Sequence, residues 1–226
     1  MEFIIDASGA PAVKFSEGKY IQILPVTRYQ FERFIWKRMP AWCEYEKSLE
    51  EVGRISPDEV TKENFASAFM TNINYDEALE FSQWLGGRLP TVREWDIAYD
   101  VVLCKGDLFR DALDYIYHRA GQKSKQTTPI SSLFGVNKGR HKRTHESTEN
   151  TRIDRRIVKL LEEFVRQGIK RADLNDAVIG ELVSEYPGPH YGRIYLKYTN
   201  KNQALVTGNQ ARKTRNRDAG FCVVVV

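Results

Sequence analysis

Cysteine is scarce in this sequence of 226 residues, and its three cysteines are far apart. They are Cys43, Cys104 and Cys222, and no two of them form a CxxC pair. Such spacing argues against a zinc knuckle and against a small disulfide scaffold. We therefore expect reduced thiols that are mostly buried as small apolar side chains.

Long apolar runs and a strong excess of charge are missing as well. No stretch approaches the roughly 18 apolar residues of a membrane span. The first residues, MEFIIDASGAPAVKF, carry acid early and do not resemble a signal peptide. The 34 basic and 30 acidic residues leave a charge of +4, which by itself does not indicate a nucleic-acid partner. We expect a cytoplasmic or virion-associated protein with neither a membrane segment nor a signal peptide, for which nucleic acid is an unlikely partner.

The composition that is present is that of a globular protein. Hydrophobic residues make up 42% and aromatic residues 12% of the chain, enough for a substantial core. The length suits one domain with an insertion. We expect a single domain over residues 1–226, with a loop and helix insertion at about 105–170.

Helix signals dominate the first half of the chain, after a short predicted strand at 19–26. Cap residues followed by apolar spacing of three and four predict helices after Thr27, Asn74 and Thr91. Glu94 stands three residues after Thr91, the spacing of a capping box. Residues 42–52 could hold a further helix, whereas 105–150 gives weak, loop-like signals.

The second half of the chain carries one helix signal and then strand signals. Residues 152–167 form an amphipathic pattern that ends at Gly168. Short β-branched or alternating runs follow: AVIGELVSEY, GRIYLKYT, QALVTG and GFCVVVV. Helices early and strands late predict an α+β fold.

Four stretches in this order resemble the formylglycine-generating-enzyme-like (sulfatase-modifying-factor) domain. They are ILPVTRYQFERFI, NINYDEALEFSQWLGGRLPTVREWDIAYDV, LNDAVIGELVSEY and RNRDAGFCVVV. The piece RLPTVREW is the most specific, and GELVSEY departs from the family pattern at Glu181, Leu182 and Ser184. The resemblance spans roughly 19–100 and 172–226. It implies a C-type-lectin-like fold of the formylglycine-generating type: two main helices on a small twisted antiparallel sheet, with much irregular loop.

The resemblance also implies a chemistry that the sequence does not support. Oxidase members use two closely spaced cysteines near the C-terminus to bind copper, and two soft thiolates suit Cu(I). Here the corresponding stretch has no cysteine, and Cys222 follows the closing Gly220-Phe221. No GxSxG, P-loop or GxGxxG is present. We therefore expect no catalytic residue, while a copper-dependent oxidase or related metal enzyme remains the alternative.

Other candidate metal ligands have simpler explanations. His141 and His145 have i,i+4 spacing but lie in the basic, turn-rich GRHKRTHEST. The oxygens of Asp173, Asn175, Asp176 and Glu181 are close in sequence and could hold calcium, although turn caps and solvated acids are the favoured explanation for them. We expect no metal site and no cofactor, with calcium as an unsupported alternative.

The C-terminal third instead has the composition of a binding surface. Tyrosine and arginine supply contact area, and asparagine and glycine adapt to a partner. This position resembles that of the variable proteins of diversity-generating retroelements, which use such a scaffold to bind a ligand. The expected partner is a protein ligand on the C-terminal loop face. The candidate ligand-binding residues are Tyr195, Lys197, Tyr198, Asn200, Asn202, Gln203, Thr207, Asn209, Gln210, Arg212, Lys213 and Arg215.

Two further interpretations remain open. Basic residues at 138–143, at Arg152, Arg155 and Arg156, and at 212–217 could form a phosphate-contacting face of a nucleic-acid-binding accessory protein. Acidic residues interrupt the first run, which favours an ordinary solvated surface. The helix at 152–167 is expected to pack on the domain, with partner binding as the alternative.

Overall fold

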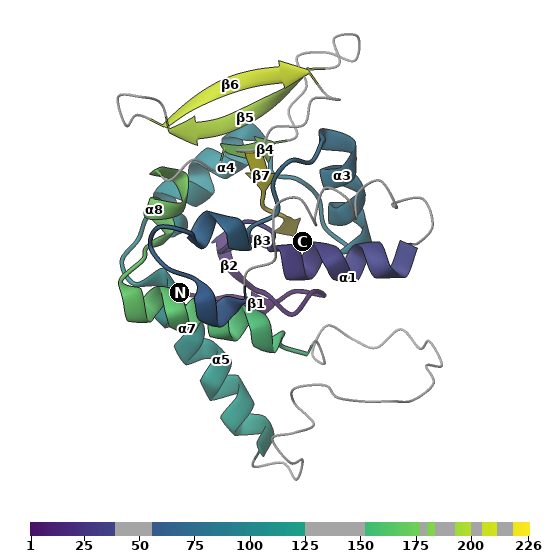
Figure 1. The fold of residues 1–226 in the computed structure, drawn as a ribbon. Helices are drawn as coiled ribbons and strands as arrows, with labels where there is room; N and C mark the ends of the chain where they lie inside the picture. The colour runs from purple at the N-terminus through teal and green to yellow at the C-terminus, as the bar shows by residue number, and fades with distance from the viewer. Residues whose placement is uncertain (39–55, 125–151, 177–179, 184–192, 200–204, 212–218) are drawn as a thin grey trace.

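The computed structural model describes residues 1–38, 56–124, 152–176, 180–183, 193–199, 205–211 and 219–226. Their helices and strands form an α+β arrangement with two four-stranded sheets, in the orders β1-β2-β3-β8 and β6-β5-β4-β7 (Figure 1). In the described part of the chain, no helix is long and apolar enough to cross a membrane.

The first sheet joins the N-terminal strands to the C-terminal end. Strands β1 (Phe3–Ile5), β2 (Pro11–Ser16) and β3 (Lys19–Gln22) form an antiparallel meander, and β8 (Val224–Val225) pairs with β3. The sequence prediction of a strand at 19–26 is confirmed, with a shorter extent. The prediction that strands come late was incomplete, because β1 and β2 precede every helix.

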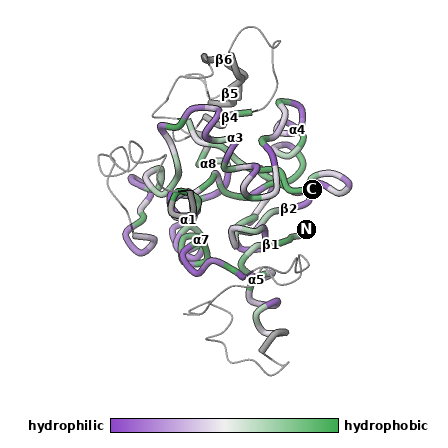
Figure 2. The backbone as a smooth tube through the Cα atoms, turned by 90° about the vertical axis from the view of Figure 1, so that its right-hand side faces the viewer, coloured by the Kyte–Doolittle hydropathy of each residue, from purple (hydrophilic) through white to green (hydrophobic). Residues whose placement is uncertain are grey.

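The second sheet contains the candidate binding strands. It consists of β4 (Gly180–Val183), β5 (Arg193–Thr199), β6 (Leu205–Ala211) and β7 (Ala219–Phe221). The β4–β5 and β5–β6 pairs are antiparallel, but β4 and β7 are parallel. Strands β5 and β6 lie at one end of the molecule and α5 at the opposite end, in both views (Figures 1 and 2).

The predicted capped helices are confirmed. They are α1 (Arg28–Arg38), α3 (Tyr75–Trp84) and α4 (Val92–Ala98), the last continued by a π-helical turn at Tyr99–Leu103. The Asn74 side chain accepts a hydrogen bond from the Glu77 amide at 3.1 Å, and Glu77 Oε2 accepts one from the Asn74 amide at 2.8 Å. These capping boxes satisfy amides that a helix start otherwise leaves without partners.

The insertion is more helical than the sequence suggested. α5 (Leu108–Ser124) spans 17 residues where loop had been expected. Its buried residues recur at helical spacing: Leu108, Phe109, Ala112, Leu113 and Ile116. α7 (Arg155–Gln167) confirms the predicted amphipathic helix, capped by Asp154 and ended by Gly168, and α8 (Arg171–Asp176) follows it.

α7 packs on the domain, as expected. Its buried face joins the larger hydrophobic core through Ile157, Leu160, Leu161 and Phe164. Its start is fixed to the β1–β2 turn, because the Asp154 amide donates to the Gly9 carbonyl at 3.0 Å. Arg33 Nη1 joins the same place by donating to the Ser8 carbonyl at 2.8 Å and to Asp154 Oδ2 at 3.2 Å.

The C-terminal segment lies between two hydrophobic cores. Cys222 and Val224 belong to the larger core, which contains Trp95 and Phe164. Phe221 and Val223 belong to the second core. There the Phe221 ring lies 5.5 Å from that of Phe81 and 6.4 Å from that of Phe31. Because successive strand residues point to opposite sides, one short segment closes both cores.

A buried polar network ties this segment to the N-terminal turn. Asp6 accepts hydrogen bonds from Ser8 Oγ at 2.6 Å and from Gln22 Nε2 at 2.6 Å. Gln22 Oε1 in turn accepts from the Val223 amide at 3.2 Å. Burial raises the pKa of the Asp6 carboxyl, while its hydrogen-bond donors act in the opposite direction. Such a network specifies one arrangement because each buried polar group needs its partner.

The Gly86-Gly87 pair ends α3 and admits the C-terminal strand. Gly86 has φ of +82°, the left-handed conformation that suits glycine after a helix. A Cβ at Gly87 would lie 2.5 Å from the Val224 carbonyl oxygen and 2.6 Å from Val223 Cγ1. The next residue, Arg88, exchanges both backbone hydrogen bonds with Val224, at 3.0 and 2.8 Å.

We expect Gly87→Ala to destabilise the protein by about 1–3 kcal/mol, because the added methyl group overlaps the backbone of the C-terminal strand. Urea unfolding at neutral pH measures this change. Gly121→Ala is the matched control, because a Cβ there meets nothing within 4 Å. Since alanine favours a helix by about 1 kcal/mol over glycine, the control should be neutral or stabilising. Equal stability of the two variants would contradict the steric explanation.

The stretch RLPTVREW joins a capping box to an ion pair. Glu94 accepts hydrogen bonds from both Arg88 terminal nitrogens at 2.6 Å and from Lys19 Nζ at 2.9 Å. It also accepts from the Thr91 amide at 3.1 Å, and the Glu94 amide donates to Thr91 Oγ1 at 3.1 Å. The Arg88 guanidinium, with Lys19, holds the pKa of Glu94 well below its usual range. Trp95 is completely buried and stacks on Tyr99 at 4.9 Å.

We expect the stability supplied by Glu94 to depend on pH. A carboxyl with a lowered folded-state pKa stabilises the fold above its unfolded pKa, near 4.5, and loses that contribution as the pH falls. Glu94→Gln keeps the shape and should cost about 1–2 kcal/mol at pH 7, since the site is partly solvated. The difference from wild type should shrink by pH 3 in urea unfolding. A constant difference across this range would contradict an ionic role.

Candidate functional site

The β5–β6 ladder brings together six of the predicted ligand-binding residues. Tyr195 is opposite Asn209 and Lys197 is opposite Thr207. Ile194 is opposite Gln210 and Tyr198 is opposite Val206. The hairpin therefore places residues that are separated along the chain directly opposite each other on adjacent strands.

The register divides these six residues between the two faces of the ladder. Positions that alternate along a strand share a face, and directly opposed positions share the same face. Tyr195, Lys197, Thr207 and Asn209 therefore occupy positions on one face. Tyr198 and Gln210 occupy positions on the other face, together with Ile194, Leu196 and Val206. The ladder thus has a mainly polar row and a mainly apolar row, and each contains some of the predicted ligand-binding residues.

The remaining predicted residues lie outside the described residues. These are Asn200, Asn202, Gln203, Arg212, Lys213 and Arg215. The possible helix at 42–52, Cys43 and the histidines His141, His145 and His190 also lie outside them.

Both ends of the candidate region are anchored in the core. Before the candidate region, β4 is anchored through Val183, which is completely buried in the larger core. The chain returns through β7, where Ala219 and Phe221 are buried. β7 pairs with β4 in parallel, with Gly180 opposite Ala219 and Leu182 opposite Phe221. The candidate region thus runs between two neighbouring strands that the core holds in place.

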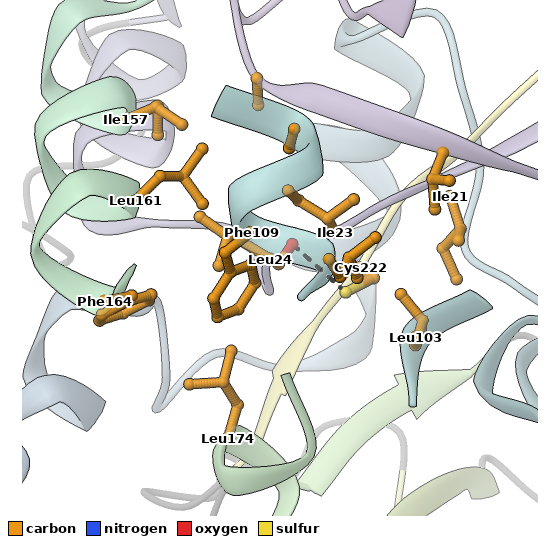
Figure 3. Packing of buried hydrophobic residues seen from close by; sticks show 14 of the residues in the cluster. Ile21, Ile23, Leu24, Leu103, Phe109, Ile157, Leu161, Phe164, Leu174 and Cys222 are labelled. Atoms are coloured by element: carbon orange, nitrogen blue, oxygen red, sulfur yellow. Dashed lines mark hydrogen bonds between the residues drawn. The ribbon is translucent and has the colours of Figure 1, made fainter. Parts of the chain in front are cut away.

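Cys222 is a core residue, as the sequence predicted. Its thiol lies among Ile21, Leu24 and Leu103 (Figure 3). It donates to the Leu24 carbonyl at 3.4 Å, and Arg171 Nη2 lies 3.7 Å from the sulfur. Cys104, by contrast, is exposed. The two described cysteines therefore have different environments, one in the core and one on the surface.

Metal-ligating residues are not grouped in the part of the chain that the structure describes. His118 is exposed on α5. Asp173, one of the predicted calcium-binding residues, accepts a hydrogen bond from the Lys170 amide at 2.7 Å, as a turn or cap residue does. For the basic residues near α7, the structure shows local pairing: Arg156 lies 3.2 Å from Asp154 Oδ2.

One hollow was not anticipated from the sequence. A cavity of about 370 Å³ lies between α1, the 3-10 turns at Pro57–Glu59 and Phe65–Ala68, and α7. Arg156 covers the Tyr29 ring with its guanidinium carbon 5.1 Å from the ring centre. Burial raises the pKa of Tyr29 to about 12. The lining residues come from four separate segments, and no local pattern connects them.

The fold indicates the general class of protein, and the match to a family model then identifies the family. The chain is an α+β protein in which two capped helices and a C-terminal strand close the core, and the β5–β6 hairpin is inserted shortly before that strand. Residues 7–148 match the model of the sulfatase-modifying factor enzyme 1-like domain. The match covers more than half of the chain, so the chain belongs to this family and the recognition made from the sequence is confirmed. No curated protein and no solved structure matches the chain.

The family match covers α1, α3, α4, α5 and the RLPTVREW stretch but ends before α7, α8 and the β5–β6 hairpin. The part of the chain that carries the family signature is therefore the scaffold. The strands with the candidate ligand-binding residues follow it, and their function has to be argued from their own geometry.

The two described cysteines should differ sharply in reactivity. In a Cys43→Ser background, we expect a water-soluble maleimide to modify Cys104 in the native protein and Cys222 only after unfolding, because Cys222 is completely buried. Intact-protein mass spectrometry counts the modified thiols. Adding Cys104→Ser provides the control and should leave no fast reaction. Fast modification of Cys222 in that control would show that the thiol is accessible.

Proposed function

We propose that this family member is a non-catalytic protein that binds a protein ligand through the β5–β6 ladder and the neighbouring C-terminal segments. More specifically, we propose that it is a variable protein of a diversity-generating retroelement. The observation that carries the proposal is the position of the ladder between β4 and β7, two adjacent strands anchored in the core.

This arrangement separates stability from recognition. The described core residues lie in the N-terminal sheet, in the helices and the segments that connect them, in β4 and in the segment from Ala219 onward. The cores therefore receive their buried residues from both sides of the candidate region. Substitutions on the exposed positions of a surface hairpin usually change stability little, within about 0.5 kcal/mol. Such a frame suits a surface that presents different side chains on one scaffold.

The residue types of the ladder suit a protein ligand. Its polar row contains Tyr195, Lys197, Thr207 and Asn209, which combine aromatic contact area with hydrogen-bonding groups. Tyrosine restricts only two torsions when it binds, so it supplies contact area at a small entropic cost. Protein ligands with mixed polar surfaces match this combination better than a small apolar ligand does.

The alternative within the family is a copper-dependent oxidase, which needs two converging thiolates. The environment of Cys222 supports the binding proposal instead, because its sulfur lies in the core against Leu24 and Arg171. The proposal includes no catalytic residue, metal or cofactor. A nucleic-acid partner is less favoured, because basic side chains such as Arg33 and Arg156 are paired with Asp154.

Sequencing sibling copies of the gene tests the retroelement proposal. We expect substitutions to cluster between residues 190 and 217, at positions such as Tyr195 and Asn209. Residues 86–95 and 219–226 serve as internal controls and should stay constant, because they carry the cap, the ion pair and the buried C-terminal strand. A reverse transcriptase gene and a near-copy of the 3′ coding end, differing at adenines, should lie nearby. Evenly spread variation, or none in the ladder, would contradict the proposal.

A further inference from the structure

β6 is an edge strand of unusual composition. It forms the outer member of its sheet among the described strands, and its seven residues are LVTGNQA. Its ladder with β5 is regular from Leu205 to Ala211, without a register shift. Natural edge strands are commonly protected by lysine, proline, a bulge or a short length. β6 has none of these four protections.

The other strand edges in the described part of the chain are short or covered. β8 has two residues, and Val224 exchanges two backbone hydrogen bonds with Arg88. β7 has three residues, and the Val26 amide donates to its Phe221 carbonyl at 2.8 Å. β1 also has three residues. Among the strands that the structure describes, β6 is therefore the one long, uncharged edge.

We propose that β6 pairs with β6 of a second copy of this chain, antiparallel and centred on Gly208. This inference goes beyond the proposed function and does not depend on it. In such a pair Leu205 is opposite Ala211, Val206 is opposite Gln210, and Thr207 is opposite Asn209. The strand is therefore self-complementary: no like charges meet, and Thr207 and Asn209 form a pair of hydrogen-bonding residues. A twofold axis generates both halves of the contact from one strand, as in most homodimers.

The pairing joins two four-stranded sheets edge to edge. Backbone N–H and C=O groups on the outer side of β6 provide the bonds, so the contact does not depend on particular side chains. A single strand pair buries little area, below about 1,200 Å², which is typical of weak and reversible association. We therefore expect a dimer that forms as the protein concentration rises. The two polar rows of the dimer would lie on one extended sheet.

Gly208 offers a direct test because it is opposite itself in the proposed pair. Gly208→Lys and Gly208→Glu each place like charges across the twofold axis, while on β5 the opposed residue is the uncharged Leu196. We expect wild type to dimerise in sedimentation velocity over a concentration series, and each charged variant to associate at least about tenfold more weakly. An equimolar mixture of the two variants should recover dimers, because lysine then meets glutamate. Gly208→Thr is the uncharged control and should still dimerise.

Hydrogen exchange of the wild-type protein gives a second measurement that needs no variant. In an antiparallel strand, successive N–H groups point to alternate sides. We expect every second amide of residues 205–211 to exchange more slowly at high than at low protein concentration, read by NMR. The amides bonded to β5 should not change with concentration.

Three results would overturn the proposal. The first is a wild-type protein that stays monomeric throughout the concentration series, as it would if β6 accepted only an extended segment of a different protein. The second is dimerisation that the charged variants leave unchanged or that their mixture does not restore, provided circular dichroism shows that they fold. The third is exchange along 205–211 that is independent of concentration. The pattern of variation among sibling genes does not depend on whether the protein dimerises, so the two proposals can fail separately.

Discussion

The backbone contact between Arg88 and Val224 is the constraint on which the rest of the structure depends. It holds the C-terminal segment against the turn that connects α3 and α4, where Gly87 leaves room for the strand. Once the segment is in place, Phe221 and Val223 fill one core while Cys222 and Val224 fill the other. The Asp6 network fixes the same segment from the opposite side, through Gln22 and the Val223 amide. A small number of residues thus connects the N-terminal turn, helices α3 and α4, and both cores.

The family signature has a structural meaning in this frame. In RLPTVREW, Thr91 and Glu94 form the cap of α4. The Arg88 side chain forms an ion pair with Glu94, and the Arg88 backbone forms hydrogen bonds with Val224. The arginine therefore connects a helix cap to the closing strand through two different parts of the same residue. Trp95 then fills the larger core beneath this connection. The stretch that most clearly identifies the family is a structural joint and carries no evident chemistry of its own.

The sequence predicted those elements that carry their own local signals. α1, α3, α4 and α7 are preceded by the cap residues Thr27, Asn74, Thr91 and Asp154, and each buries apolar residues at helical spacing. α5 also has such a stripe, from Leu108 to Ile116. The many turn-forming residues that follow it in the sequence weakened the helix signal of the whole region. β1 and β2 are short, and their pairing depends on a contact between distant residues, as with most strands.

The composition of the C-terminal third suggested the candidate site, but its geometry could not be predicted from the sequence. Tyrosine, asparagine and lysine in the C-terminal third led us to expect a binding surface, yet only the register shows which residues are opposed across the two strands, such as Tyr195 and Asn209. The cavity beside Tyr29 could not be predicted, because its lining comes from segments far apart in the chain. Local patterns report local structure, whereas a surface or cavity depends on which distant segments the core brings together.

The buried C-terminal strand also has a consequence for how the protein is made. Residues 219–225 are translated after the whole candidate binding region, and both cores need them. The emerging chain therefore cannot complete its core until the ribosome has passed the ladder. A product interrupted by a stop codon or a frameshift within residues 184–218 would lack the closing strand and remain unfolded, exposed to proteases. Folding would in this way select for messages in which the reading frame through the binding region is intact.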